Sequence, residues 1–132
     1  MSGPPAAATA PAAERHILLL DLRDEPAAIA AYDAWHAVGA VPAAVVAGIR
    51  ARGIADMQIF RAGNRLVMLL EPGAGFDPQA KVGMDAATPE IEAWERLMDG
   101  FQQAIPGATP GAKWTAAHRI FALGEQLGEE PS

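Results

Sequence analysis

The sequence predicts an α+β fold with the element order β-α-β-β-α-β, and three observations support this prediction. A short apolar run at 16–22 precedes a segment with helical spacing of its apolar residues. A Gly-Asn turn at 62–64 joins two further short apolar segments. A second amphipathic helix begins near Pro89, and an apolar segment follows it. This order is that of the ferredoxin-like split unit.

The length of 132 residues corresponds to one domain, which we expect to span residues 15–124. Residues 1–14 are rich in proline and alanine, so they bury too little apolar surface to offset the entropy cost of ordering. Residues 125–132 are acidic. Both ends are therefore predicted to be flexible tails.

Charge and cysteine content exclude several classes of function. The net charge is −6 and the pI is about 4.9, which argues against nucleic acid or an anionic membrane as the main partner. No apolar run reaches the roughly 18 residues needed to span a bilayer, and the N-terminus lacks the features of a secretory signal. The chain has no cysteine, which excludes disulfides and thiolate chemistry and fits a cytoplasmic location.

Two helical segments are predicted after the first strand. Pro26 suits the first turn of a helix, because its missing N–H is not needed there. Gly39 and Pro42 interrupt the apolar spacing, so we expect one helix at 25–38 and a second piece at 42–51. The two pieces could also form one kinked helix.

The remaining elements follow from alternation and turn chemistry. Residues 54–61 and 65–71 should form a β-hairpin around the Gly-Asn turn. A second helix is expected at 89–103, with an apolar stripe of Ile91, Trp94, Met98 and Phe101. Residues 114–123 should form the last strand.

The strands are too apolar for a sheet with one solvated face. Two helices can cover only one face, and side chains alternate between the faces of a strand. Several apolar residues therefore cannot all lie under the helices, namely Leu18, Leu20, Val67, Leu69 and Phe121. We expect a second copy of the chain to cover the other face, which predicts a homodimer packed sheet to sheet.

Tyr32 and His36 form the most suggestive pair of polar side chains. They are four residues apart, so on a helix they lie on one face, with Trp35 at its border. A phenol and an imidazole beside an indole could hold a small polyol and move its protons. The spacing alone equally allows Tyr32 and Trp35 to be packing residues with His36 exposed. No pair of histidines has the helical spacing of metal ligands, and no nucleotide-binding motif is present.

The chain resembles the L-rhamnose mutarotase family of small dimeric α+β barrel proteins, over residues 16–123. The motifs that carry the resemblance are Tyr32-x-x-x-His36, the hairpin Met57-Gln-Ile-Phe60 with Asn64-Arg65-Leu66, Glu92-Ala-Trp94-Glu-Arg-Leu-Met98 and Trp114-Thr…Arg119-Ile-Phe121. The resemblance implies that Tyr32 contacts the pyranose and that His36 is the acid–base catalyst. It also implies that Trp94 is the first of two adjacent aromatics lining the pocket.

Two positions depart from the family pattern. Met57 stands where the family commonly has another sugar-contacting tyrosine, and Glu95 stands where the second aromatic is expected. We expect these two residues, with Trp94 and Trp35, to contact the substrate. The departures leave the identity of the sugar open.

Two functions of different classes follow. The first is a mutarotase that interconverts the anomers of a 6-deoxyhexose such as L-rhamnose or L-fucose. Ring opening and closure needs groups that exchange protons near neutrality, and histidine, with an unperturbed pKa of roughly 6.5, is such a group. Anomer exchange needs no cofactor and no metal. The second is a ligand-binding member of the dimeric α+β barrel group whose pocket has diverged at Met57 and Glu95.

Overall fold

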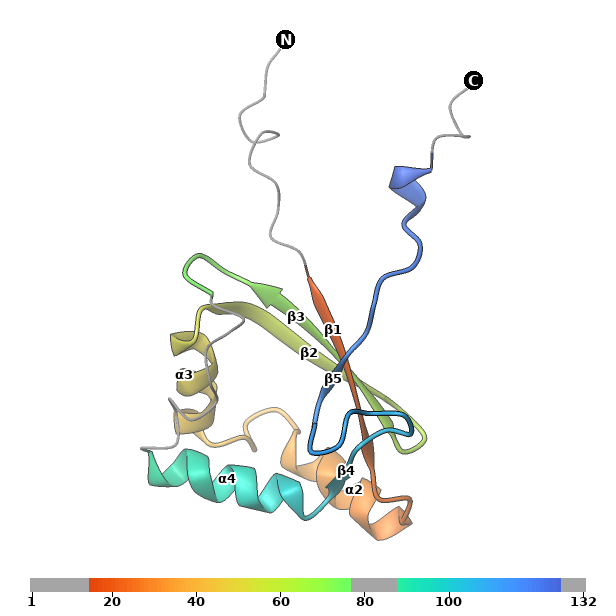
Figure 1. The fold of residues 1–132 in the computed structure, drawn as a ribbon. Coiled ribbons are helices and arrows are strands. Elements are labelled where there is room, and N and C mark those ends of the chain that lie inside the picture. The colour runs from red at the N-terminus through yellow and green to blue at the C-terminus, as the bar shows by residue number, and fades with distance from the viewer. Residues whose placement is uncertain (1–14, 77–87, 127–132) are drawn as a thin grey trace.

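The structure, a computed structural model, describes residues 15–76 and 88–126 (Figure 1). The predicted tail 1–14 and residues 127–132 of the predicted acidic tail lie outside the described residues. In chain order the elements are β1 (His16–Leu22), α2 (Pro26–Trp35), α3 (Ala43–Ala51), β2 (Ile54–Ala62), β3 (Arg65–Pro72), α4 (Pro89–Asp99), β4 (Gln102–Gln103), β5 (Thr115–Ala116) and the 3₁₀ turn η2 (Leu123–Glu125).

The strands form one antiparallel sheet with the order β2-β3-β1-β4, and β5 also pairs with β1. Helices α2, α3 and α4 lie together on one side of this sheet (Figure 1). The first strand is therefore central, between the hairpin and the short last strands. This arrangement confirms the predicted ferredoxin-like α+β fold.

The predictions for the first half of the chain agree closely with the structure. The first strand and the β2–β3 hairpin are confirmed, and Gly63 in the turn has a φ of 61°, which favours glycine. The helical segment is two separate helices, because α2 ends at Trp35 and α3 begins after Pro42. A single kinked helix is thus excluded.

Two predictions for the second half were wrong in extent. The helix expected at 89–103 ends at Asp99, and residues 102–103 pair with β1 as β4. The strand expected at 114–123 covers only 115–116. Leu18 lies opposite Ala116, so an antiparallel strand that continued beyond residue 118 would extend past the start of β1 and have no neighbour there.

Both faces of the sheet are apolar, because side chains alternate between the faces and the strands are apolar at most positions. The face under the helices carries the residues that form the core, including Leu18, Leu20, Leu22, Leu66, Met68 and Leu70. The opposite face carries partly exposed apolar residues, namely Ile17, Leu19, Phe60, Val67 and Leu69. Of the residues expected to divide between the faces, Phe121 lies in neither, because it follows β5 and is 61% exposed.

Candidate active site

A cavity of about 490 Å³ lies between the helix-covered face of the sheet and the helices. Much of its wall is apolar, with residues such as Val45, Ile49, Ile54, Met68, Leu70 and Ile91. Its polar lining consists of His16, Tyr32, His36, Arg52, Glu95, Gln102 and Lys113. An apolar cavity with a few convergent polar groups is the usual form of a small-molecule site.

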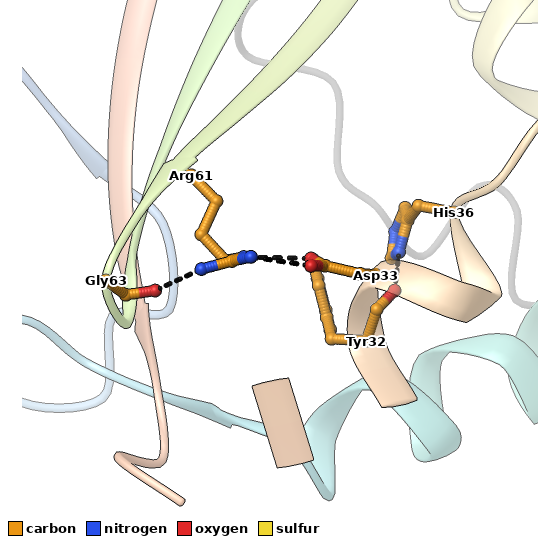
Figure 2. A network of polar contacts seen from close by, with 5 residues as sticks. All are labelled: Tyr32, Asp33, His36, Arg61 and Gly63. Atoms are coloured by element: carbon orange, nitrogen blue, oxygen red, sulfur yellow. Dashed lines mark hydrogen bonds and ion pairs between the residues drawn. The ribbon is translucent and has the colours of Figure 1, made fainter. Parts of the chain in front are cut away.

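Tyr32 and His36 lie side by side on this wall. Figure 2 shows that both come from the C-terminal end of α2. Their ring centroids are 4.2 Å apart, and Tyr32 is buried. Because α2 ends at Trp35, the backbone N–H of His36 bonds to the carbonyl of Asp33 rather than to that of Tyr32. The freed Tyr32 carbonyl oxygen lies 2.8 Å from Nδ1 of the His36 ring.

This contact fixes the tautomer of the neutral imidazole. A carbonyl oxygen can only accept a hydrogen bond, so Nδ1 of His36 must carry the proton. In the neutral ring the lone pair is then on Nε2. His36 is therefore prepared to accept a proton at Nε2, and the backbone of its own helix holds the ring in place.

Two tryptophans follow the imidazole in a chain of edge-to-face contacts. The rings of His36 and Trp94 have centroids 5.4 Å apart, and those of Trp94 and Trp35 are 6.1 Å apart at 82°. Trp94 is buried and lines the cavity. Trp35 is 40% exposed and lies behind Trp94, outside the residues that line the cavity.

The two positions that depart from the family pattern also reach the cavity. Met57 points from β2 toward the helices and lines it. Glu95 lies beside Trp94 on α4, with its carboxylate 3.6 Å from Nζ of Lys113. A second cavity of about 260 Å³ shares His36, Trp94 and Met57 with the first. The structure thus brings five of the six expected site residues to one place.

Sequence reasoning missed several residues of the site. Gln102 donates a hydrogen bond from Nε2 to the Tyr32 hydroxyl oxygen, at 3.2 Å. Lys113 and Trp114 reach the cavity from the segment before β5. Residue 102 was placed in a helix, and no local pattern marks Lys113. Trp114 belongs to a motif of the family resemblance, but no role in the site was assigned to it.

The histidines outside α2 differ from each other in their surroundings. His16, at the start of β1, is partly buried, lines the cavity and packs against Phe76 with ring centroids 5.6 Å apart. His118 is exposed and lies outside the residues that line the cavity.

Burial is the main influence on the pKa of the Tyr32 hydroxyl. Removal of the phenol from water raises its pKa above the ordinary value, the hydrogen bond from Gln102 lowers it in part, and the carboxylate of Glu95 raises it further. The net direction is upward, so the hydroxyl stays protonated at neutral pH. The Tyr32 O–H can therefore donate a hydrogen bond in the cavity.

Neither a metal site nor a membrane span is found in the part of the chain that the structure describes. Across residues 15–76 and 88–126, no three His, Asp or Glu side chains are grouped so that they could hold a metal ion. None of the described helices is long and apolar enough to cross a membrane.

An ion pair ties α2 to the hairpin directly beside this site (Figure 2). Arg61 of β2 contacts Asp33 with two nitrogens, Nε to Oδ1 at 2.9 Å and Nη2 to Oδ2 at 2.6 Å. Its third nitrogen donates to the carbonyl of Gly63 at 2.7 Å. Since Asp33 follows Tyr32 directly, this two-point contact fixes the turn of α2 that carries the site.

Arg61→Met should raise the pKa of Asp33 toward the ordinary value of about 3.9. The hydrogen bond and charge of Arg61 lower that pKa in the folded protein. A lowered pKa adds stability that is present above about pH 3.9 and is lost as the pH falls through the folded-state value. Carboxyl-carbon NMR titration measures the shift. Urea denaturation should show wild type and variant differing at pH 7 and converging as the pH falls through the folded-state pKa of Asp33. An unchanged Asp33 titration would contradict the contact.

Comparison with known proteins gives a consistent family. The profile of the family described as L-rhamnose mutarotase matches residues 15–123. An L-fucose mutarotase of Xanthomonas campestris pv. campestris is 51% identical over 114 residues, which are 86% of this chain and 91% of that protein. A UPF0734 protein of Dictyostelium discoideum is 35% identical over 75 residues, which are 54% of this chain and 60% of that protein.

The family match covers most of the chain, including all the helices and strands that enclose the cavity. The first relative matches over nearly its whole length, so the similarity is not confined to one motif. The chain therefore belongs to the L-rhamnose mutarotase family and is an isomerase that interconverts sugar anomers.

Proposed function

We propose that the protein interconverts the α and β anomers of L-fucose, with His36 as the proton shuttle and Tyr32 as a hydrogen-bond donor to the sugar. The observation that carries this proposal is the contact between Nδ1 of His36 and the Tyr32 carbonyl, which leaves the lone pair of the neutral ring on Nε2, at the wall of the cavity. The L-fucose mutarotase relative supports the choice of sugar.

In the proposed reaction, Nε2 of His36 takes the proton from the anomeric hydroxyl. The C1–O5 bond breaks as the carbonyl at C1 forms, and His36 returns the proton to O5. Rotation about C1–C2 presents the other face of the carbonyl, and the reverse steps close the ring. No atom is gained or lost, and the imidazole ends in its starting state.

Tyr32 supports these proton transfers without losing its own proton. Its raised pKa disfavours the phenolate, so the hydroxyl donates a hydrogen bond to a sugar oxygen instead. A donor that stays fixed in a largely apolar cavity stabilises negative charge on oxygen more than water would.

The apolar wall suits a deoxy sugar. Trp94 offers an indole to the C–H face of a pyranose, and Met57 and Ile54 can accept the methyl group of a 6-deoxyhexose. A 6-hydroxyl at the same wall would lack hydrogen-bond partners and would bind less well. Trp35 acts indirectly, because it packs against Trp94.

L-Rhamnose is the second candidate substrate, because the family whose profile matches is described by that sugar. The two sugars differ in the configuration of ring hydroxyls, and both carry the 6-methyl group. Saturation-transfer NMR with equal concentrations of each sugar, and of L-galactose as the 6-hydroxylated counterpart of L-fucose, measures the exchange rates. We expect L-fucose to exchange fastest, and faster exchange of L-rhamnose would reverse the assignment of the sugar.

A purely ligand-binding role, the other function considered from the sequence, is less well supported. It was based on the replacements at Met57 and Glu95. Both side chains still line the cavity, and the Tyr32–His36 pair is intact. A cytoplasmic location stays a prediction from composition.

We also propose a homodimer in which the open faces of two sheets pack together. Phe60 is 54% exposed on this face, and Leu19, Val67 and Leu69 are only partly buried. Three apolar residues after β5 are exposed as well, namely Ile120, Phe121 and Leu123. A patch of this kind marks an interface in a stable protein.

Sedimentation velocity at micromolar concentration should give a species of twice the 13.8 kDa chain mass. Phe60→Asp should shift it toward monomer, because a carboxylate would be buried at the interface. Val38→Asp, at a fully exposed position away from the sheet, is the matched control and should stay dimeric. A wild-type chain that is monomeric and soluble would exclude this assembly.

A further inference from the structure

Gln102 enters the cavity because of the register between β4 and β1. Gln102 lies opposite Leu22, whose side chain is in the core under the helices, and Gln103 lies opposite Asp21. Paired residues share a face of the sheet, so Gln102 points toward the helices and Gln103 points away from them. Gln102 lines the cavity, and Gln103 is exposed.

Only one of the two polar atoms of the Gln102 amide has a hydrogen-bond partner among the described residues. Nε2 donates to the Tyr32 hydroxyl oxygen, but Oε1 is buried and accepts no hydrogen bond from any residue within 15–76 or 88–126. A buried carbonyl without a donor costs free energy, and such groups in native proteins usually have a reason. A ligand hydroxyl would provide the missing donor when a small turn of the amide brings Oε1 to the cavity that Gln102 lines.

The Tyr32 hydroxyl, in contrast, still has a hydrogen to donate. Its hydroxyl oxygen already accepts the bond from Gln102, so its O–H remains available to donate into the cavity. The two side chains therefore present one acceptor, Oε1 of Gln102, next to one donor, the Tyr32 O–H. A sugar hydroxyl is both donor and acceptor, and one such group can satisfy both.

We propose that Gln102 is a substrate-binding residue that selects the sugar, by accepting a hydrogen bond at Oε1 from a ring hydroxyl that also accepts one from Tyr32. This inference rests on the proposed mutarotase function. A sugar with that hydroxyl in the other configuration would leave Oε1 unpaired, and sites of this kind reject such substrates strongly. The contact is made by a residue outside the Tyr32–His36 helix, so it adds a determinant of specificity to the acid–base pair.

The test pairs a protein change with a sugar change. Gln102→Met keeps the length of the side chain and removes the amide, and Gln103→Met makes the same change on the exposed side of β4. Saturation-transfer NMR gives kcat and KM for L-fucose and for its 2-deoxy, 3-deoxy and 4-deoxy analogues. We expect Gln102→Met to lower kcat/KM for L-fucose about 5- to 20-fold, the cost of one unmade buried hydrogen bond. Gln103→Met should not change it.

The deoxy sugars identify the contact. For the one analogue that lacks the contacted hydroxyl, wild type and Gln102→Met should be equal, because the interaction is already absent. An equal loss with all four sugars would assign Gln102 a merely structural role, and no loss with L-fucose would also overturn the inference. Wild type that accelerates no sugar would instead refute the proposed function itself. If Gln102→Met fails to fold by far-UV circular dichroism, Gln102→Asn, with its shortened amide, replaces it and should show the same pattern.

A second readout does not depend on the reaction. Tyr32 is the only tyrosine of the chain, so ultraviolet titration of phenolate absorbance reports its pKa directly. The hydrogen bond from Gln102 lowers that pKa, so Gln102→Met should raise it, whereas Gln103→Met should leave it unchanged. An unchanged titration in Gln102→Met would overturn the contact from which the inference starts.

Discussion

His36→Ala is expected to lower the rate of anomer exchange by about 10²- to 10⁴-fold, which is the usual contribution of a positioned acid–base group. The imidazole lies on the cavity wall, with Nδ1 bound by the Tyr32 carbonyl and Nε2 free to take a proton. Alanine removes both functions. The backbone of α2 does not depend on the ring, because the helix ends one residue earlier.

The control for this variant is His118→Ala. His118 is exposed and outside the cavity, so its removal should leave the exchange rate unchanged. Saturation-transfer NMR on L-fucose measures both variants, and far-UV circular dichroism checks that they are folded. A folded His36→Ala protein with nearly full activity would contradict the role of His36.

Leu66→Ala is expected to reduce the free energy of unfolding by about 2–5 kcal/mol, the range for buried leucines in well-packed cores. Leu66 is 1% exposed and belongs to the same core cluster as Tyr32 and Trp94. Removal of three carbons leaves a space that the sheet and helices can close only in part. Urea denaturation at pH 7 measures the change.

Val38→Ala provides the comparison, since it also removes apolar carbons, but from a side chain that is fully exposed and lies away from the proposed interface. Its effect on the free energy of unfolding should stay within about 0.5 kcal/mol. Equal effects of the two substitutions would contradict the core assigned to the sheet.

The elements that the sequence predicts well are those with a local cause. The β2–β3 hairpin is defined by alternation on both sides of a turn in which Gly63 takes a positive φ. Tyr32 and His36 meet because four residues are about one turn of a helix. In both cases the partners are close in sequence, so spacing is enough.

The elements that the sequence predicts poorly depend on partners far along the chain. β4 and β5 have two residues each and are strands only because β1 lies beside them. Their shortness gives no periodicity to detect. Gln102 reaches Tyr32 across 70 positions, and this contact exists only once β4 has paired.

The position of Trp35 also depends on a distant part of the chain. Its spacing of three from Tyr32 places it near the same side of α2, and we expected it to contact the sugar. In the structure Trp94 occupies the place beside His36, and Trp35 packs on the outer edge of Trp94. Which indole faces the cavity therefore depends on the packing of α4 against α2, and spacing within α2 alone does not predict it.

The central claim is that this cavity catalyses anomer exchange, and one measurement tests it most directly. Saturation of the α-anomer proton of L-fucose, with the wild-type protein at micromolar concentration and pH 7, should reduce the β-anomer signal far more than in buffer alone. The transfer should depend on protein concentration and disappear with His36→Ala. No transfer above the buffer rate, for L-fucose or L-rhamnose, by a folded protein would contradict it.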